Sequence, residues 1–227
     1  MDIILKIIAS TINWVIDLIV PNEEKLARLL LLSDSELRRL LPKAVDIEDP
    51  LSFPIFNYRN KDVKTLIWAL KYKAHPQILD RLASILYEEI IAVAEEHMEF
   101  EGKTNITLVP IPMSNQRLRE KGFNQTEILC EKINKISVGV ISVLNILEKT
   151  KNTTHQTSLH RRERLQNMRG SIQLRQGYAG QVPPDSLLII IDDVYTTGAT
   201  ITEARRALST KHGSPDLSRT LAITLAH

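Results

Sequence analysis

Apolar residues along the 227-residue chain follow two spacings, and each spacing predicts a different kind of element. In residues 3–20 the apolar side chains recur at steps of three and four, which is typical of an amphipathic helix. They are Ile4, Ile8, Ile12, Val15 and Ile19. Residues 186–191 instead hold five large apolar residues in six positions without alternation. That pattern favours a strand covered on both faces, as in a parallel sheet.

The first 45 or so residues read as helical, including a helix that ends before Pro42 and begins at a capping box formed by Ser33 and Glu36. Residues 46–60 contain three stop signals and predict a linker. These are Pro50, Pro54 and Asn57. We therefore expect an N-terminal helical segment over residues 1–50 and one larger domain over residues 51–227.

Helices and strands alternate in the larger domain. Predicted helices cover residues 61–73, a following segment with one apolar face (Leu79, Leu82, Leu86, Ile90 and Val93), residues 124–136 and residues 201–212. Predicted strands cover residues 105–112, a segment of 138–149 that ends in a turn, residues 186–192 and residues 219–227. Residues 148–171 are polar and predict a mobile loop. The fold class is α/β, a doubly wound parallel sheet with an N-terminal helical extension.

Composition excludes several classes of protein. The contents of 43% hydrophobic and 25% charged residues are ordinary for a globular protein, and the net charge of +2 confines any basic surface to a local patch. The single cysteine, Cys130, rules out an internal disulfide framework and multi-cysteine zinc sites, so we expect no zinc. Its place beside Ile133 on an apolar helix face favours a core role over a nucleophile.

The apolar N-terminal segment raises the question of a membrane. Lys6, Asn13 and Asp17 interrupt it, and no small-residue cleavage site follows. A helix packed on the domain or on a partner is the better interpretation, with no membrane span and a cytoplasmic location as the expectation.

Two adjacent acids, Asp192 and Asp193, end the apolar strand and are followed by a turn rich in hydroxyl groups and a helix. Backbone N–H groups at a helix N-terminus bind phosphate, and Thr196, Thr197 and Thr200 add hydroxyl donors around Gly198. The acids suit a diol or a hydrated metal ion. Phosphate on one side and a diol on the other describe a ribose 5-phosphate. The alternative is a capping turn in which Thr200 and Glu203 form a capping box.

Residues 187–200 resemble the signature of type I phosphoribosyltransferases that binds phosphoribosyl pyrophosphate (PRPP). Residues 58–73, 109–129 and 156–172 resemble the ComF family, the competence-associated branch of that superfamily, and the resemblance extends from about Val15 to the C-terminus. It implies the type I phosphoribosyltransferase fold. It also implies that Asp192 and Asp193 hold the ribose hydroxyls, with Mg²⁺ bound indirectly through water, and that Thr196, Thr197, Gly198, Ala199 and Thr200 hold the 5-phosphate.

The match departs from the family in two places. ComF proteins carry a cysteine-rich zinc finger near the N-terminus, whereas this chain has glutamates and a helix there. Purine salvage relatives place an aspartate where Thr196 stands, to transfer the proton of the ring nitrogen, and a threonine cannot act as that acid or base at neutral pH. The sequence therefore argues against zinc and against hypoxanthine or guanine as the acceptor.

A basic loop is predicted after the strand that ends near Pro112, with Arg117, Arg119 and Lys121 at alternate positions. Ligands of open α/β sheets bind beyond the carboxyl ends of strands. In the superfamily this loop faces pyrophosphate, and neutralising that leaving group lowers the barrier. The alternative is a solvated charged turn.

The polar loop carries a second basic cluster, Arg161, Arg162 and Arg164, near Arg169. It is either a lid over PRPP or a nucleic-acid patch, with a solvated basic helix as the third alternative. His155 and His160 have no companion ligands at metal-binding spacing, so we interpret them as polar loop residues.

Two functions remain in competition. The first is a Mg²⁺-dependent transferase in which Asp192, Asp193, Arg119 and Lys121 take catalytic roles, Arg117 also binds PRPP, and an unidentified acceptor displaces pyrophosphate. The second is a non-catalytic adaptor in DNA uptake or regulation, with single-stranded DNA or a protein of the competence machinery as its partner.

Overall fold

The computed structural model describes residues 23–101, 105–150, 168–177, 182–183, 185–209 and 220–227. Its helices are α2 (Glu23–Leu31), α3 (Asp34–Leu40), α4 (Lys61–Trp68), the π-helical turn η1 (Ala69–Lys73), α5 (Pro76–Glu101), α6 (Asn115–Lys121), α7 (Gln125–Ile136) and α9 (Ala199–Ser209). Its strands are β1 (Ser52–Phe56), β2 (Asn105–Pro110), β3 (Ile141–Val143), β4 (Leu147–Lys149), β5 (Ile172–Leu174), β6 (Ser186–Val194) and β7 (Leu221–Ala226).

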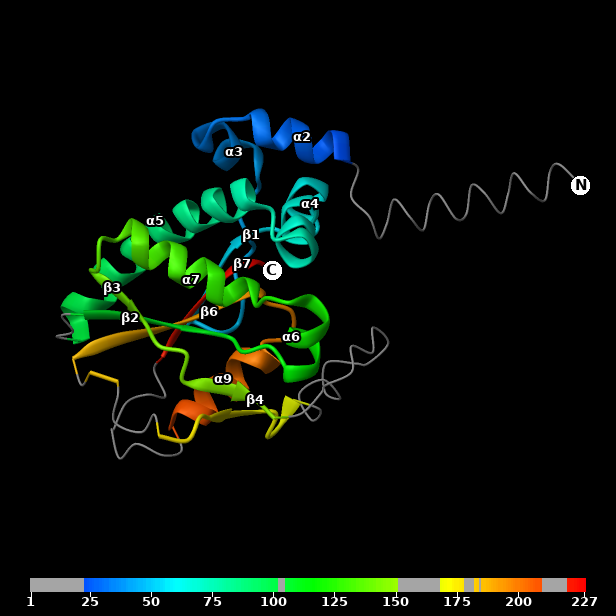
Figure 1. Cartoon of the computed structure of the whole chain (residues 1–227). Helices are drawn as coiled ribbons and strands as arrows, with labels where there is room; N and C mark the ends of the chain where they lie inside the picture. Colours follow the sequence, from blue (N-terminus) through cyan, green and yellow to red (C-terminus); the bar gives the residue numbers. More distant parts are fainter. Residues whose placement is uncertain (1–22, 102–104, 151–167, 178–181, 184, 210–219) are drawn as a thin grey trace, which may run out of the picture.

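Five strands form one parallel sheet in the order β1-β7-β6-β2-β3. The central strand β6 is buried from Ser186 to Ile191, as its unbroken apolar run predicts. Alternate residues of β6 reach opposite faces: Leu187, Ile189 and Ile191 join the core under α5 and α7, whereas Leu188 and Ile190 join the core with α9, β4 and β5. Helices therefore cover both faces (Figure 1), which confirms the predicted doubly wound sheet.

The helices α2 and α3 lie within the predicted N-terminal helical segment. The predicted capping box is present, because the Ser33 side chain accepts from the Glu36 N–H and the Glu36 carboxylate accepts from the Ser33 N–H. Leu26, Leu29 and Leu37 are buried in the same core as the sheet. Residues 3–20, for which an amphipathic helix is predicted, lie outside the described residues. In the part of the chain that is described, no helix is long and apolar enough for a membrane crossing.

The predicted linker over residues 46–60 is wrong in its middle, because Ser52–Phe56 forms β1 and pairs with β7. β1 lies at the edge of the sheet, where Pro54 is tolerated because one side of the strand needs no ladder donor. The predicted loop over residues 148–171 is wrong at its start, since Glu148 and Lys149 lie in β4, which pairs antiparallel with β5. Residues 151–167 of that loop lie outside the described part of the chain.

Candidate active site at the carboxyl end of β6

Both acids lie inside strand β6, which continues to Val194, two residues beyond the predicted strand end at residue 192. Asp193 is 7% exposed and Asp192 is half-buried. Because neighbouring side chains of a strand point to opposite faces, Asp193 follows Ile189 and Ile191 towards α7, and Asp192 points to the side of β4 and α9. The acids consequently have different surroundings.

Asp193 is held by two donors from the α5–α7 side of the sheet. The Lys71 ammonium of η1 lies 3.0 Å from Asp193 Oδ1. The Gln125 side-chain amide at the start of α7 donates to Asp193 Oδ2 at 2.5 Å. Burial opposes the charge of Lys71, but attraction and hydrogen bonding from Asp193 more than offset it and raise the pKa of Lys71.

Asp192 is the acid that meets unfavourable surroundings. Its Oδ1 accepts the backbone N–H of Asp193 at 2.8 Å. Removal of the carboxylate from water, together with the neighbouring charge of Asp193, raises the pKa of Asp192 to about 7. Lys71 and Lys149 oppose that shift but do not cancel it. A site with these properties favours a ligand that brings positive charge or hydroxyl donors to Asp192.

The turn after β6 leads directly into α9. Gly198 has φ +74° and its carbonyl accepts from the Thr202 N–H at 2.9 Å, so α9 starts immediately after this glycine. The Thr197 hydroxyl accepts from the Ala199 N–H at 3.5 Å. The first turn of α9 therefore presents backbone N–H groups beside the hydroxyl groups of Thr196, Thr197 and Thr200.

The alternative capping box of Thr200 and Glu203 is absent, because Thr200 already lies in the first helical turn. The Glu203 carboxylate instead accepts from the Gly170 N–H and pairs with Arg206 at 2.7 Å. The predicted capping box is therefore wrong.

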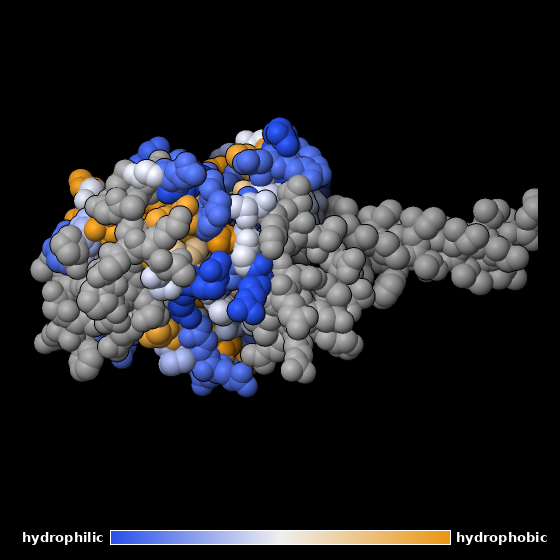
Figure 2. All heavy atoms as spheres, turned by 90° about the horizontal axis from the view of Figure 1, so that it is seen from below, coloured by the Kyte–Doolittle hydropathy of each residue, from blue (hydrophilic) through white to orange (hydrophobic). Residues whose placement is uncertain are grey.

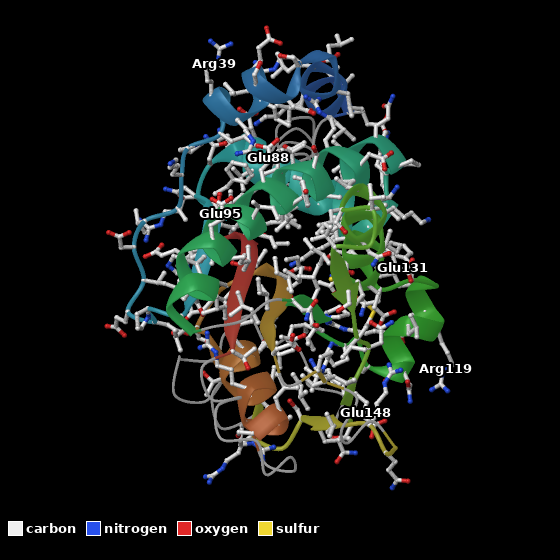
Figure 3. All side chains as sticks on the ribbon, turned by 90° about the vertical axis from the view of Figure 1, so that its left-hand side faces the viewer. Arg39, Glu88, Glu95, Arg119, Glu131 and Glu148 are labelled. Carbon is white, nitrogen blue, oxygen red and sulfur yellow. The ribbon has the colours of Figure 1, made fainter. Side chains whose placement is uncertain are left out.

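The predicted basic loop is a short helix, α6. Ser114 is its N-cap and accepts from the Arg117 N–H at 3.4 Å, while Gly122 ends it with φ +84°. Alternate positions of a helix lie about 200° apart, so Arg117 and Arg119 point in different directions. Arg119 extends away from the rest of the molecule (Figure 3).

Lys121 lies on the side of the acids. Its ammonium bonds the Gln125 side chain and lies 4.3 Å from the centroid of the Phe123 ring. Burial lowers the pKa of Lys121 to about 8, and the charges of Lys71 and Arg117 act in the same direction against the attraction of Asp193. Of the predicted basic residues on α6, Lys121 thus interacts electrostatically with Asp193, Arg117 acts on Lys121 and Lys149, and Arg119 points elsewhere.

Comparison with known proteins finds relatives of this chain, although no protein-family model matches it. The chain is 25% identical over 154 residues to "Competence protein F" of Haemophilus influenzae, which covers 68% of this chain and 65% of that protein. It is 30% identical over 154 residues to "Competence protein ComFC" of Streptococcus pneumoniae, covering 68% of this chain and 60% of that one. Over 144 residues it is 26% identical to "DNA utilization protein YhgH" of Escherichia coli K12, covering 63% and 59%. The chain belongs to the ComF family. It spans less than two thirds of the length of each of these relatives.

This ComF-family chain has a cleft of about 530 Å³ between α6, the start of α7 and strand β4. Pro112, Met113 and Leu118 supply its apolar lining, and Glu148 and Lys149 are among its charged groups. Burial and the charge of Arg117 lower the pKa of Lys149, and the attraction of Asp192 acts against them. Lys149 thus lines the cleft and also interacts electrostatically with Asp192. Figure 2 shows the face of the molecule that carries α9 and β4, where hydrophilic side chains gather beside apolar ones.

Three contributors to the site were missed in the sequence: Lys71, Gln125 and His227. His227 Nδ1 lies 2.9 Å from the Tyr195 carbonyl oxygen, and its ring meets the Tyr195 ring edge-on at 5.5 Å. The Tyr195 N–H also donates to the Ala226 carbonyl at 2.8 Å. These contacts fix the start of the turn after β6, and they join residues far apart in sequence that no local pattern connects.

The other predicted residues divide into two groups. Cys130 is fully buried, which confirms its core role. Burial also raises the pKa of its thiol well above the ordinary value for cysteine. The candidates Arg161, Arg162 and Arg164, as well as His155 and His160, lie outside the described residues. Within the described ranges, no group of three or more His, Cys, Asp or Glu residues gathers as a metal site.

Proposed function

We propose that this ComF-family protein binds PRPP with Mg²⁺ at the carboxyl end of β6 and transfers its phosphoribosyl group to an acceptor. The observation that carries the proposal is the acid pair in a strand that continues through a glycine turn into the N-terminus of α9. This arrangement offers acceptors for the two ribose hydroxyls and donors for the 5-phosphate within one strand–turn–helix unit.

Each part of PRPP then has a partner in the chain. The first-turn N–H groups of α9 and the hydroxyl groups of Thr196, Thr197 and Thr200 would hold the 5-phosphate. Asp192 and Asp193 would accept the ribose hydroxyls. Lys121 and Arg117 would balance the charge of the pyrophosphate.

The acid pair also suits Mg²⁺. This ion keeps several waters and is held by one or two carboxylates together with substrate phosphates, so a site of only two acids meets its needs once PRPP supplies the rest. Bound Mg²⁺ would neutralise charge that develops on the pyrophosphate. The protein would orient the sugar through Asp192 and Asp193 as the C1–O bond to pyrophosphate breaks and a bond from C1 to the acceptor forms, with the breaking bond's electrons leaving on pyrophosphate.

We place the acceptor in the cleft between α6 and β4, because Lys149 connects its lining to Asp192 electrostatically. The names of the relatives, competence proteins and a DNA utilization protein, support a role in DNA uptake for this chain. A non-catalytic adaptor for DNA uptake is the second candidate, and the same names favour it equally.

Turnover separates the two candidates. The protein is incubated with PRPP, Mg²⁺ and a panel of nucleobases, nucleosides and single-stranded DNA, and released pyrophosphate is measured. We expect release with at least one acceptor, and none from the double variant Asp192→Asn/Asp193→Asn. If no acceptor yields pyrophosphate above that variant, the adaptor is the better account.

We also predict a pH dependence from Lys121. Its ammonium would hold pyrophosphate, and since its pKa lies at about 8 it is charged below that pH and neutral above it. PRPP affinity should therefore fall about tenfold between pH 7 and pH 9, a difference of about 1.4 kcal/mol. Calorimetric titration at several pH values measures this, and Lys121→Arg is the control because arginine stays charged throughout. An unchanged affinity in the wild-type protein across this range would remove Lys121 from the pyrophosphate site.

A further inference from the structure

The π-helical turn η1 sends two lysines in opposite directions. Lys73 extends to Glu23 at 2.8 Å and lies 5.4 Å from the centroid of the Trp68 ring, away from the sheet. Lys71 extends inward to Asp193. The preceding helix α4 is anchored through buried Val63, Leu66 and Ile67, so the base of this turn is fixed against the core. π-turns inside helices are frequently found at functional sites.

The ion pair that Lys71 forms is largely removed from solvent. The side chains of Lys71 and Asp193 are 30% and 9% exposed. Asp193 lies directly beside a second carboxylate, and its other partner, Gln125, is neutral. Lys71 is thus the charged group in contact with Asp193 that offsets both burial and the charge of Asp192.

Lys71 also lies on a different face of the sheet from the first turn of α9, which would hold the 5-phosphate. Asp193 points from β6 to the α5–α7 face, and Lys71 reaches it from that face. Asp192 and the first turn of α9 belong to the other face, together with Lys149. Lys71 therefore contacts the acid pair from the face opposite to the proposed 5-phosphate site.

We propose that Lys71 is a positioning residue that acts through Asp193 and does not itself touch PRPP. With Gln125, it fixes the orientation of the Asp193 carboxylate, so that this acid is ready to accept a ribose hydroxyl. The Asp192 carboxylate accepts a backbone N–H and, among the described residues, has no such side-chain donor, so it adapts to the ligand. The inference rests on the proposed PRPP site, and it gives residues 58–73 a role in that site.

A double-mutant cycle tests this role. Lys71→Met, Asp193→Asn and the double variant are titrated with Mg²⁺ and PRPP, and their melting temperatures are measured without ligand. We expect Lys71→Met to weaken PRPP binding at least fivefold in the wild-type background and less than twofold in the Asp193→Asn background, because its target is then gone. Lys71→Arg should restore most of the affinity.

Lys73→Met is the matched control, since it removes a lysine of the same turn whose ion pair is exposed, and it should leave PRPP affinity unchanged. Lys71→Gln replaces Lys71→Met if the latter does not fold. An equal loss of affinity from Lys71→Met in both backgrounds would mean direct contact with PRPP and would overturn the proposal. No loss of affinity in either background would also overturn it.

The ligand-free measurement keeps this inference separate from the proposed function. Lys71→Met should lower the melting temperature by about 4–8 °C, and Asp193→Asn should suppress most of that loss because no charge remains unpaired at that position. If the wild-type protein does not bind PRPP, the proposed function fails. A non-additive change in melting temperature would still support the action of Lys71 through Asp193, and an additive one would overturn it.

Discussion

Asp192→Asn and Asp193→Asn should each lower PRPP affinity at least tenfold, about 1.4 kcal/mol, yet change stability in opposite directions. Both variants keep the size of the side chain and remove the charge that would accept a hydroxyl or orient hydrated Mg²⁺. Asp193→Asn leaves Lys71 without its counter-charge and should destabilise the protein. Asp192→Asn removes a carboxylate that burial and Asp193 already disfavour, and should stabilise it.

The stabilisation by Asp192→Asn should depend on pH. The folded-state pKa of Asp192, about 7, lies above its ordinary value of 3.8, so the native state binds the proton more tightly than the unfolded chain does. The stability that the neutral acid contributes is fully present below the pKa of Asp192 in the unfolded chain, and it is lost as the pH rises towards 7. Asp192→Asn should therefore raise the free energy of unfolding by about 1–2 kcal/mol at pH 8 and by nearly nothing at pH 4. The value at pH 8 is smaller than the full pKa shift implies, because solvent still reaches the carboxylate.

Thermal unfolding of both variants at pH 4 and pH 8, followed by calorimetric titration with PRPP, measures these effects. Unaltered PRPP binding in the two variants would show that the acids do not hold the ligand. Equal stability changes in the two variants would contradict the different surroundings assigned to Asp192 and Asp193.

Gly198→Val should abolish the shape of the turn before α9. Gly198 has φ +74°, which a β-branched residue rarely adopts, and any Cβ there would meet the Tyr195 hydroxyl and lie 2.8 Å from Tyr195 Cζ. The Tyr195 ring would have to leave His227 to make room. We expect PRPP affinity to fall more than tenfold and stability to fall by about 2 kcal/mol.

Gly139→Val is the matched control for backbone strain. Gly139 lies between α7 and β3, has φ +85° and has nothing within 4 Å of the position of a Cβ, so the variant carries the strain without the steric clash. It should lower the melting temperature while PRPP affinity stays within twofold. Similar losses of affinity in the two variants would mean that the contact of Gly198 with Tyr195 has no bearing on the site.

The sequence predicted the parts of the fold that depend on continuous local patterns. The apolar run of β6, the capping box of α3 and the one-sided helix α5 are examples in which buried side chains follow the expected spacing. β1 was missed because proline was interpreted as a stop signal, although an edge strand tolerates it. The helix α6 was missed because Leu118 is its single large apolar residue, but Ser114 and Gly122 marked its two ends.

The candidate site was predictable only where its residues are consecutive. Asp192, Asp193 and the threonines of the turn stand together in sequence, and their roles towards PRPP and Mg²⁺ stay predictions. The partners of Asp193 come from elsewhere: Gln125 is 68 residues away, and Lys71 is farther still. No local pattern indicates that a lysine will reach inward, because that direction is set by the packing of α4 and η1 against the core.

Calorimetric titration of the wild-type protein with PRPP in the presence of Mg²⁺ tests the central claim most directly, with ribose 5-phosphate and pyrophosphate as separate comparison ligands. If the acid pair, the α9 turn and α6 form one site, PRPP should bind one equivalent per chain. It should bind at least tenfold more tightly than either fragment, because it engages all three parts at once. Absence of PRPP binding, or an affinity no greater than that of pyrophosphate alone, would contradict the account.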